Sequence, residues 1–226
     1  MNLDLSGKHA LVGGSSQGLG KASAIELALL GANITLMARD ENRLKATLAL
    51  LDRSFGQEHR YLVVDFTQPN ALKQAVAKLV AEHPVHILVN NTGGPPAGAA
   101  NTALTEDYLS AFQNHLICNQ ILMQTVVEGM KAAAFGRIIN IISTSVKQPL
   151  DNLGVSNTIR GAVANWSKTL ANELAQFGIT VNNVLPGATY TARLETIIQN
   201  NALKKNMTED DIIAEMEQEV PARRIG

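Results

Sequence analysis

A glycine-rich turn near the start of the chain has the residue types and spacing of a phosphate-binding loop. Residues 13–20 read GGSSQGLG and lie between an apolar run and a helix-length amphipathic segment. Glycine lets the backbone approach a pyrophosphate closely, and the following helix offers unpaired N–H groups and a positive dipole end. These flanks favour a dinucleotide-binding turn over a plain strand-to-helix connection, which is the alternative for this segment alone. The residues expected to line the dinucleotide here are Gly14, Ser16, Gly18, Leu19 and Gly20.

Two charged residues follow the next apolar run and bear on which dinucleotide is bound. Arg39 and Asp40 come directly after Asn33–Ala38. In a doubly wound fold this strand end lies beside the adenosine ribose, where an acid holds the 2′-hydroxyl of NAD and an arginine holds the 2′-phosphate of NADP. Arg39 therefore favours NADP(H). Asp40 leaves NAD(H) open, because a shift of one residue in the strand end would exchange the two side chains, and Arg39 as a solvated surface charge is the structural alternative.

Short apolar runs alternate with helix-length segments along most of the chain. The strands expected are His9–Val12, Asn33–Ala38, Tyr61–Asp65, Val85–Asn90, Arg137–Ile142 and Thr180–Leu185. The helices expected are Leu19–Leu30, Glu41–Phe55, Asn70–Glu82, Thr105–Ala134 and Val155–Phe177. This alternation predicts one α/β domain, a doubly wound parallel sheet with helices on both faces. After Pro186 the pattern loosens into one more helix, Thr208–Gln218, and ends without the closing strand expected of this fold, so we expect a missing C-terminal strand.

The composition excludes several classes of function. The 226 residues carry 19 Lys plus Arg and 20 Asp plus Glu, so no basic surplus suggests nucleic acid or an anionic membrane as a partner. The single cysteine, Cys118, allows no intramolecular disulfide and no cysteine-based metal site. The first residues lack the apolar core of a signal peptide, and no apolar run approaches the ~20 residues of a membrane helix. We therefore expect a cytoplasmic protein.

Five segments in order resemble the short-chain dehydrogenase/reductase family, and the resemblance extends over essentially the whole chain. The segments are GGSSQGLG at 13–20, VDF at 64–66, NNTG at 90–93, GRIINIIS at 136–143 and GITVNNVLPGATYT at 178–191. The first matches the family's TGxxxGxG, with Gly13 in place of threonine. The branch most similar is that of the 3-oxoacyl-acyl-carrier-protein reductases.

The resemblance implies a cofactor site, a substrate region and an assembly. The implied cofactor residues are Gly14, Gly18, Gly20, Arg39, Asp65, Phe66, Asn90 and Gly93, with Pro186, Gly187 and Thr189 near the nicotinamide. A substrate loop and helix would follow at about 187–220. The resemblance also implies a homotetramer or homodimer, with helix Val155–Phe177 in a subunit interface.

The residues that normally carry this family's chemistry are only partly present. The family uses Asn, Ser, Tyr and Lys, and Ser143 matches the serine. Ser156 stands where the tyrosine belongs and Arg160 where the lysine belongs, because the helix aligns without a gap. His115 falls at the asparagine position. Asn114 is adjacent, but one residue is about 100° of helix rotation, so it needs a one-residue slip to serve.

These replacements change the proton chemistry of the expected site. A serine hydroxyl is a poor proton donor, and arginine stays protonated. Of these four residues, His115 alone has a side chain that titrates near neutrality, so it or a water could move the proton. The alternative is that His115 only fills the place of the asparagine in the helix. We predict an NADP(H)-linked oxidoreductase acting on a small carbonyl or alcohol substrate. A catalytically silent dinucleotide-binding protein with a regulatory or scaffolding role is the alternative, and a changed reaction such as elimination or isomerisation is a third.

Overall fold

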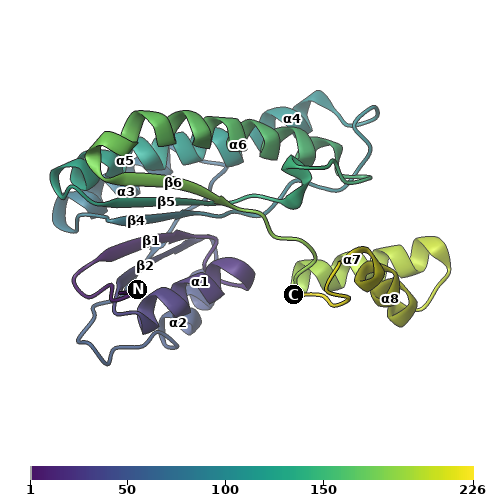
Figure 1. Ribbon diagram of the computed structural model, residues 1–226, viewed down its shortest axis with the longest axis horizontal. Coiled ribbons are helices and arrows are strands. Elements are labelled where there is room, and N and C mark those ends of the chain that lie inside the picture. Colours follow the sequence, from purple (N-terminus) through teal and green to yellow (C-terminus); the bar gives the residue numbers. More distant parts are fainter. Residues whose placement is uncertain (1) are drawn as a thin grey trace. The chain divides into compact units, whose positions relative to one another are not determined.

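The computed structural model describes residues 2–226, which form two compact units that meet in the sequence at Leu185 and Pro186 (Figure 1). The first unit is built on a six-stranded sheet in the order β3-β2-β1-β4-β5-β6. The strands are β1 (His9–Gly13), β2 (Asn33–Ala38), β3 (Arg60–Val63), β4 (Ile87–Asn90), β5 (Gly136–Ile141) and β6 (Ile179–Val184). Every neighbouring pair is parallel. The order reverses between β1 and β4, which confirms the doubly wound sheet and fixes its switch point.

Helices cover both faces of this sheet (Figure 1). They are α1 (Gly18–Leu29), α2 (Glu41–Leu48), α3 (Pro69–Glu82), α4 (Thr105–Phe112), the π-helix η1 (Gln113–Ile117), α5 (Cys118–Ala132), the 3-10 turn η2 (Thr144–Val146), α6 (Gly154–Leu174) and the 3-10 turn η3 (Ala175–Phe177). One hydrophobic cluster joins the sheet to α1 and α2, and a second joins it to α3, α5 and α6. Central strands such as β1 are buried on both faces, as their continuous apolar runs predict.

Two of the expected helices differ from the structure. The helix expected over Glu41–Phe55 ends at Leu48, because a local turn replaces it. In that turn Asp52 Oδ1 accepts a hydrogen bond from the Ser54 N–H at 2.9 Å, and Gly56 adopts a φ of +75°. Such aspartate-capped turns compete with helix for the same backbone groups. The helix expected over Thr105–Ala134 is interrupted by η1, a feature that no local pattern in the sequence indicated.

The second unit, from Pro186 onward, is a pair of helices around a small core. Its helices are α7 (Ala192–Lys205) and α8 (Glu209–Glu219). The core contains Leu194, Ile198 and Ile212, with Ile225 tucked against them. α8 confirms the helix expected over Thr208–Gln218, including Thr208 as its cap. α7 lies where the sequence pattern loosens, and the sequence analysis did not place it. It begins after Thr191, whose side chain accepts a hydrogen bond from the Leu194 N–H.

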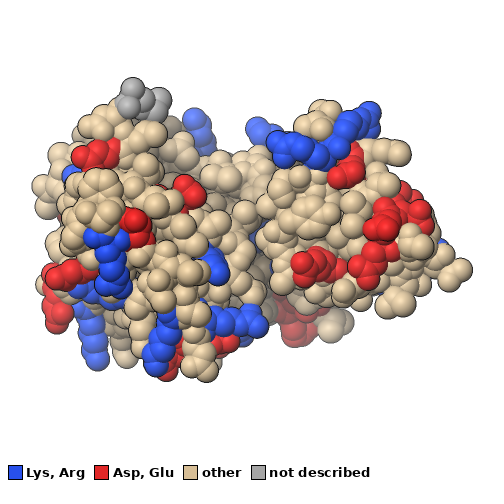
Figure 2. Space-filling model, turned by 90° about the horizontal axis from the view of Figure 1, so that it is seen from below, with Lys and Arg blue, Asp and Glu red and all other residues tan. Residues whose placement is uncertain are grey.

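The chain has a formal net charge of -1 at pH 7. On the face drawn in Figure 2, basic and acidic side chains are interspersed rather than gathered into one basic surface. Among residues 2–226 no helix combines the length and apolarity needed to cross a membrane.

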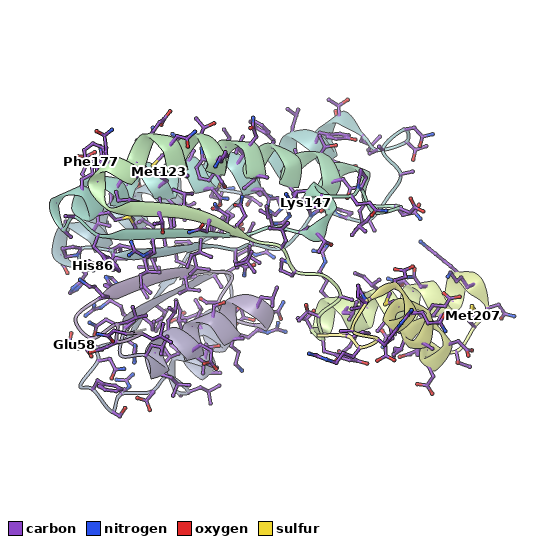
Figure 3. All side chains as sticks on the ribbon, viewed as in Figure 1. Glu58, His86, Met123, Lys147, Phe177 and Met207 are labelled. Atoms are coloured by element: carbon purple, nitrogen blue, oxygen red, sulfur yellow. The ribbon has the colours of Figure 1, made fainter. Side chains whose placement is uncertain are left out.

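A buried histidine lies at the edge of the sheet where the strands begin. His9, on β1, is 5% exposed; its Nε2 lies 2.8 Å from Thr35 Oγ1 and its Nδ1 lies 3.2 Å from the Pro84 carbonyl. Burial, reinforced to a lesser degree by the positive charge of Arg60, lowers the pKa of His9 to about 4. Figure 3 places His86, a neighbour of this group, at the end of the sheet opposite Lys147.

Because the pKa of His9 is lowered in the folded protein, we expect the free energy of unfolding to fall in mild acid. In the unfolded chain His9 regains a pKa near 6.5, so the unfolded state binds the extra proton as pH drops from about 6.5 towards 4. The free energy of unfolding should then fall by up to about 3 kcal/mol across that window. Urea unfolding at several pH values checks this, with His9→Gln as the comparison. If the free energy of unfolding of His9→Gln fell as steeply with pH as that of the wild type, His9 would not be the source of the effect. A smaller pH dependence should remain in His9→Gln, because burial also lowers the pKa of His59 and His86.

Candidate active site

The carboxyl ends of the parallel strands bring most of the expected site residues of the first unit to one edge of the sheet. The glycine turn follows β1, Arg39 follows β2, Asp65 follows β3, Asn90 ends β4 with Gly93 just beyond it, and Ser143 follows β5. Lys147, which ends η2, marks this edge in Figure 3. Ligands of open α/β sheets bind in the crevice outside these strand ends, so the arrangement is that of a binding site.

The glycine turn is shaped so that only glycine fits at its key positions. Gly14 and Gly18 have φ values of +56° and +54°. A Cβ at Gly20 would lie 2.4 Å from the Gly14 carbonyl oxygen, and one at Gly14 would lie 2.6 Å from Asn91 Nδ2. The turn is therefore a close-packed cradle of bare backbone leading into α1. That geometry fits the pyrophosphate of a dinucleotide.

Two residues without an expected role hold this turn in place. Asn91 Nδ2 donates to the carbonyl oxygens of Gly13 at 3.2 Å and Gly14 at 3.4 Å. Ser15 Oγ accepts from the Met37 N–H at 2.8 Å, which ties the turn to the end of β2. The signal for Asn91 was its place in the NNTG segment beside a strand end. Nothing in the sequence singled out the buried Ser15.

The structure separates the roles of Arg39 and Asp40. Asp40 caps α2, because its Oδ1 accepts from the Arg43 N–H at 3.0 Å. That carboxylate is therefore engaged with a helix, and Arg39 is the exposed residue directly after β2. Asp65 lies close enough for Arg39 to help lower its pKa, although the Thr67 backbone N–H contributes most. The end of β2 thus presents a cation where an adenosine ribose would lie, which fits a 2′-phosphate.

Two expected cofactor residues after β3 and β4 differ in exposure. Phe66 is 7% exposed and belongs to the core beneath α5, where the Cys118 thiol donates to its carbonyl oxygen. Burial raises the pKa of Cys118 to about 11, so this thiol is not a nucleophile at neutral pH. Gly93 faces open space, since a Cβ there would meet nothing within 4 Å.

A buried amide network fixes α6 against the sheet. Asn140 on β5 accepts from Asn90 Nδ2 at 2.8 Å and donates to Ser167 Oγ on α6 at 2.8 Å. Ser167 Oγ also lies 2.8 Å from Asn183 Oδ1 on β6. Ser167 lies two helical turns after Arg160, so the network sets the position of the helix that carries the expected catalytic residues.

Ser143, Ser156 and Arg160, the expected catalytic residues that follow β5, lie on or beside η2 and α6, which contact each other. Ser143 caps η2 by accepting from the Ser145 N–H at 3.1 Å. Ser156 and Arg160 are one turn apart on α6, and α6 packs against η2. Arg160 Nη1 donates to the Ile141 carbonyl oxygen on β5 at 2.7 Å, which holds the guanidinium at the strand end. Ser156 is 8% exposed.

His115 lies on the π-helix η1, which also packs against α6. His115 is 3% exposed, and the amide oxygen of the adjacent Asn114 is buried as well. A π-turn takes up an extra residue and rotates the side chains around it, and such turns occur often at functional sites. Which of Asn114 and His115 takes the family's asparagine position stays a prediction.

Unpaired buried polar atoms gather around these residues. Among residues 2–226, the buried side-chain atoms without a hydrogen-bond partner are Asn90 Oδ1, Asn114 Oδ1, Ser145 Oγ and Asn157 Oδ1. They lie at the end of β4, on η1, on η2 and in the first turn of α6, the elements that carry or adjoin the expected catalytic residues. Buried polar atoms are normally satisfied by protein, water or ligand. Their concentration here fits a site that receives a polar ligand.

Three expected nicotinamide residues lie in the second unit. Pro186, Gly187 and Thr189 precede α7, and Thr189 Oγ1 donates to the Gly187 carbonyl oxygen at 3.3 Å. Their approach to the cofactor stays a prediction, as does the single-domain organisation with a substrate region at about 187–220.

Comparisons with known proteins agree with this geometry. The model of the short-chain dehydrogenase family matches residues 8–202. The chain is 32% identical to the 3-oxoacyl-acyl-carrier-protein reductase FabG of Escherichia coli, over 99% of this chain and 86% of the relative. L-sorbose reductase from Gluconobacter frateurii, solved with NADPH and L-sorbose, superposes with a TM-score of 0.92 at 28% identity, covering 100% of this chain and 87% of that one.

A polyketide ketoreductase gives the same result. An actinorhodin polyketide ketoreductase variant solved with NADPH superposes with a TM-score of 0.88 at 29% identity, covering 97% of this chain and 85% of that one. The match therefore extends over the glycine turn, the strand ends and the helix that carries Ser156 and Arg160. The chain belongs to the short-chain dehydrogenase family.

Proposed function

We propose that this chain is an NADP(H)-linked oxidoreductase that interconverts a small carbonyl compound and its alcohol. The observation that carries the proposal is the gathering of unpaired buried polar atoms at the strand ends, beside a glycine cradle and the exposed Arg39. The NADPH complexes of the sorbose reductase and the polyketide ketoreductase support the cofactor. The names of the relatives support a carbonyl reaction without fixing the substrate.

The cofactor and the protein have separate tasks in this reaction. NADPH supplies the hydride, and the protein binds, orients and stabilises charge. The turn at Gly14–Gly20 would hold the pyrophosphate, and Arg39 the 2′-phosphate. The Ser143 hydroxyl would donate to the substrate oxygen, where negative charge develops as hydride arrives. Arg160, held at the end of β5, would orient the nicotinamide ribose and add positive charge near Ser156.

The proton needs another carrier, because Ser156 replaces the tyrosine. A serine hydroxyl is far less acidic than a phenol, and arginine stays protonated. His115, buried on η1 against α6, is the candidate within the chain, and a water held by neighbouring polar atoms is the other. Replacing His115 by Asn separates them: a marked loss of turnover assigns the proton to His115, whereas retained turnover assigns it to water.

Turnover with Ser143→Ala tests the proposal directly. NADPH oxidation is followed by its loss of absorbance with a panel of ketones, aldehydes and 3-oxoacyl thioesters. Removing one preorganised donor to a developing oxyanion typically lowers kcat about 100-fold, while NADPH binding should change little. A substrate of the wild type turned over equally fast by Ser143→Ala would contradict the assigned site.

The replacement of the family's tyrosine and lysine also favours one alternative, a dinucleotide-binding protein without catalytic activity. With Ser156 and Arg160 in the positions of tyrosine and lysine, the chain could bind the dinucleotide without turning over a carbonyl. Tight NADPH binding with no turnover across the panel would establish this silent regulatory or scaffolding role.

The assembly and location we propose follow from the family and the surface. Large apolar side chains are exposed on and beside α4, including Leu104, Leu109 and Phe112. An apolar surface of this kind is typical of a protein contact, so we propose a homodimer or homotetramer. We also propose a cytoplasmic location, which suits a chain with a single cysteine.

A further inference from the structure

A second arginine lies beside the glycine turn and is held from two sides. Arg43, in the first turn of α2, donates from Nη1 to Gln17 Oε1 at 2.6 Å. Its Nε lies 3.3 Å from Asp40 Oδ2. Gln17 directly precedes α1, and Asp40 caps α2, so the guanidinium bridges the openings of the two helices that follow β1 and β2.

Stability does not explain this arrangement. The side chains of Arg43 and Asp40 are 60% and 49% exposed, and an exposed ion pair of this kind contributes about 0–1 kcal/mol. What the two contacts do achieve is to restrict a long, flexible side chain to one place. A guanidinium carries five N–H donors, and these contacts use two of them. The remaining donors can form the paired hydrogen bonds that arginine makes to phosphate.

The place where Arg43 is held corresponds to one part of the cofactor. In a doubly wound fold, the space between the glycine turn and the end of β2 receives the adenosine ribose. Gln17 itself is neutral, so the cations available at this position are Arg39 at the strand end and Arg43 across from it. NADP differs from NAD here by one phosphomonoester, which is close to dianionic at neutral pH.

We infer that Arg43, positioned by Gln17, is a second specificity-determining cation that binds the 2′-phosphate of NADP(H) together with Arg39. This rests on the proposed function, since it requires the chain to bind a dinucleotide. Asp40 acts here as a helix cap and tether for Arg43 rather than as a ligand of the ribose hydroxyls.

Direct titration of the purified chain with NADPH and with NADH tests this without any need for turnover. Arg43→Gln should weaken NADPH binding about tenfold, the value of one charge-assisted hydrogen bond, and leave NADH binding unchanged. Arg53→Gln is the matched control, because it removes an equal charge from an exposed site beyond α2. It should leave the affinities for both cofactors as they are.

The role of Gln17 is tested by the ratio of the two affinities. Gln17→Leu should weaken NADPH binding about threefold with NADH unchanged, and it should have no further effect in the Arg43→Gln background. A disturbance of the glycine turn itself would instead weaken both cofactors alike, which would overturn the positioning role.

The outcomes separate this inference from the proposed function. If the wild type binds neither NADPH nor NADH, the proposed function fails and the inference falls with it. If the wild type prefers NADPH and Arg43→Gln keeps the same preference, the proposed function stands and the inference is wrong. If Arg43→Gln loses the preference for NADPH and Arg53→Gln keeps it, the result supports both the proposed function and the role of Arg43.

Discussion

Gly20→Ala is expected to weaken NADPH binding by at least about 100-fold while leaving the second unit folded. The added Cβ would lie 2.4 Å from the carbonyl oxygen of Gly14 and 2.7 Å from that of Gly13. Asn91 Nδ2 would also lie 2.7 Å away. The two oxygens are backbone atoms, so relief requires the turn itself to move and not only a side chain to rotate. The cradle depends on this close packing, and the first turn of α1 would shift away from the pyrophosphate.

The comparison for this prediction is Gly129→Ala in α5. A Cβ there would approach nothing closer than 3.9 Å, and alanine is the better helix former. Its affinity for NADPH should equal that of the wild type, and its unfolding midpoint should be equal or higher. Calorimetric titration and urea unfolding on both variants give the two readouts.

A less severe change keeps the prediction testable if Gly20→Ala does not fold. Asn91→Ala removes the amide that donates to the Gly13 and Gly14 carbonyl oxygens. It should loosen the turn and weaken NADPH and NADH by similar factors. Unchanged NADPH affinity in a folded Gly20→Ala protein would show that the turn does not bind the cofactor.

The sequence predicted the sheet more fully than its connections, for a physical reason. Strands buried on both faces must be continuous apolar runs, so all six were located within two residues of their observed ends. The turn beyond α2 and the start of α7 contain instead single side-chain hydrogen bonds, from the Ser54 N–H to Asp52 and from the Leu194 N–H to Thr191. Such local contacts compete closely with helix, and apolar periodicity does not record them.

Within the site, the residues on strand ends were predictable and the residues that support them were not. Ser143 follows a strand whose position the pattern fixes. The tether between Gln17 and Arg43, by contrast, joins residues 26 apart in the sequence, and only the parallel pairing of β1 with β2 brings them together. The π-turn at His115 was also invisible, because it changes the side-chain direction without changing the apolar pattern of the helix.

Arg160→Ala is expected to lower kcat/KM about 1,000-fold. Arg160 Nη1 donates to the Ile141 carbonyl oxygen at 2.7 Å, and Ser156 lies one turn before it on α6. Truncation removes both the fixed positive charge at the strand end and the contact that holds the start of α6 against β5. Steady-state kinetics with the best substrate of the panel measures this loss.

Arg137, an arginine on β5 rather than on α6, provides the control. Arg137, at the amino end of β5, donates from Nη1 to the carbonyl oxygens of Gly136 at 2.7 Å and Gly178 at 3.1 Å. Arg137→Ala therefore removes comparable backbone contacts at the edge of the sheet away from Ser143. It should lower the free energy of unfolding by about 1 kcal/mol and leave kcat/KM within about threefold of the wild type.

The variant Arg160→Lys separates charge from geometry. Lysine keeps the positive charge but offers a single ammonium in place of a planar fork. Turnover between those of the wild type and Arg160→Ala would mean that charge near Ser156 carries part of the effect and orientation the rest. If Arg160→Ala lost stability to the same extent as Arg137→Ala and kept full turnover, Arg160 would be a structural tie, and the proton and the charge would have to come from elsewhere in the site.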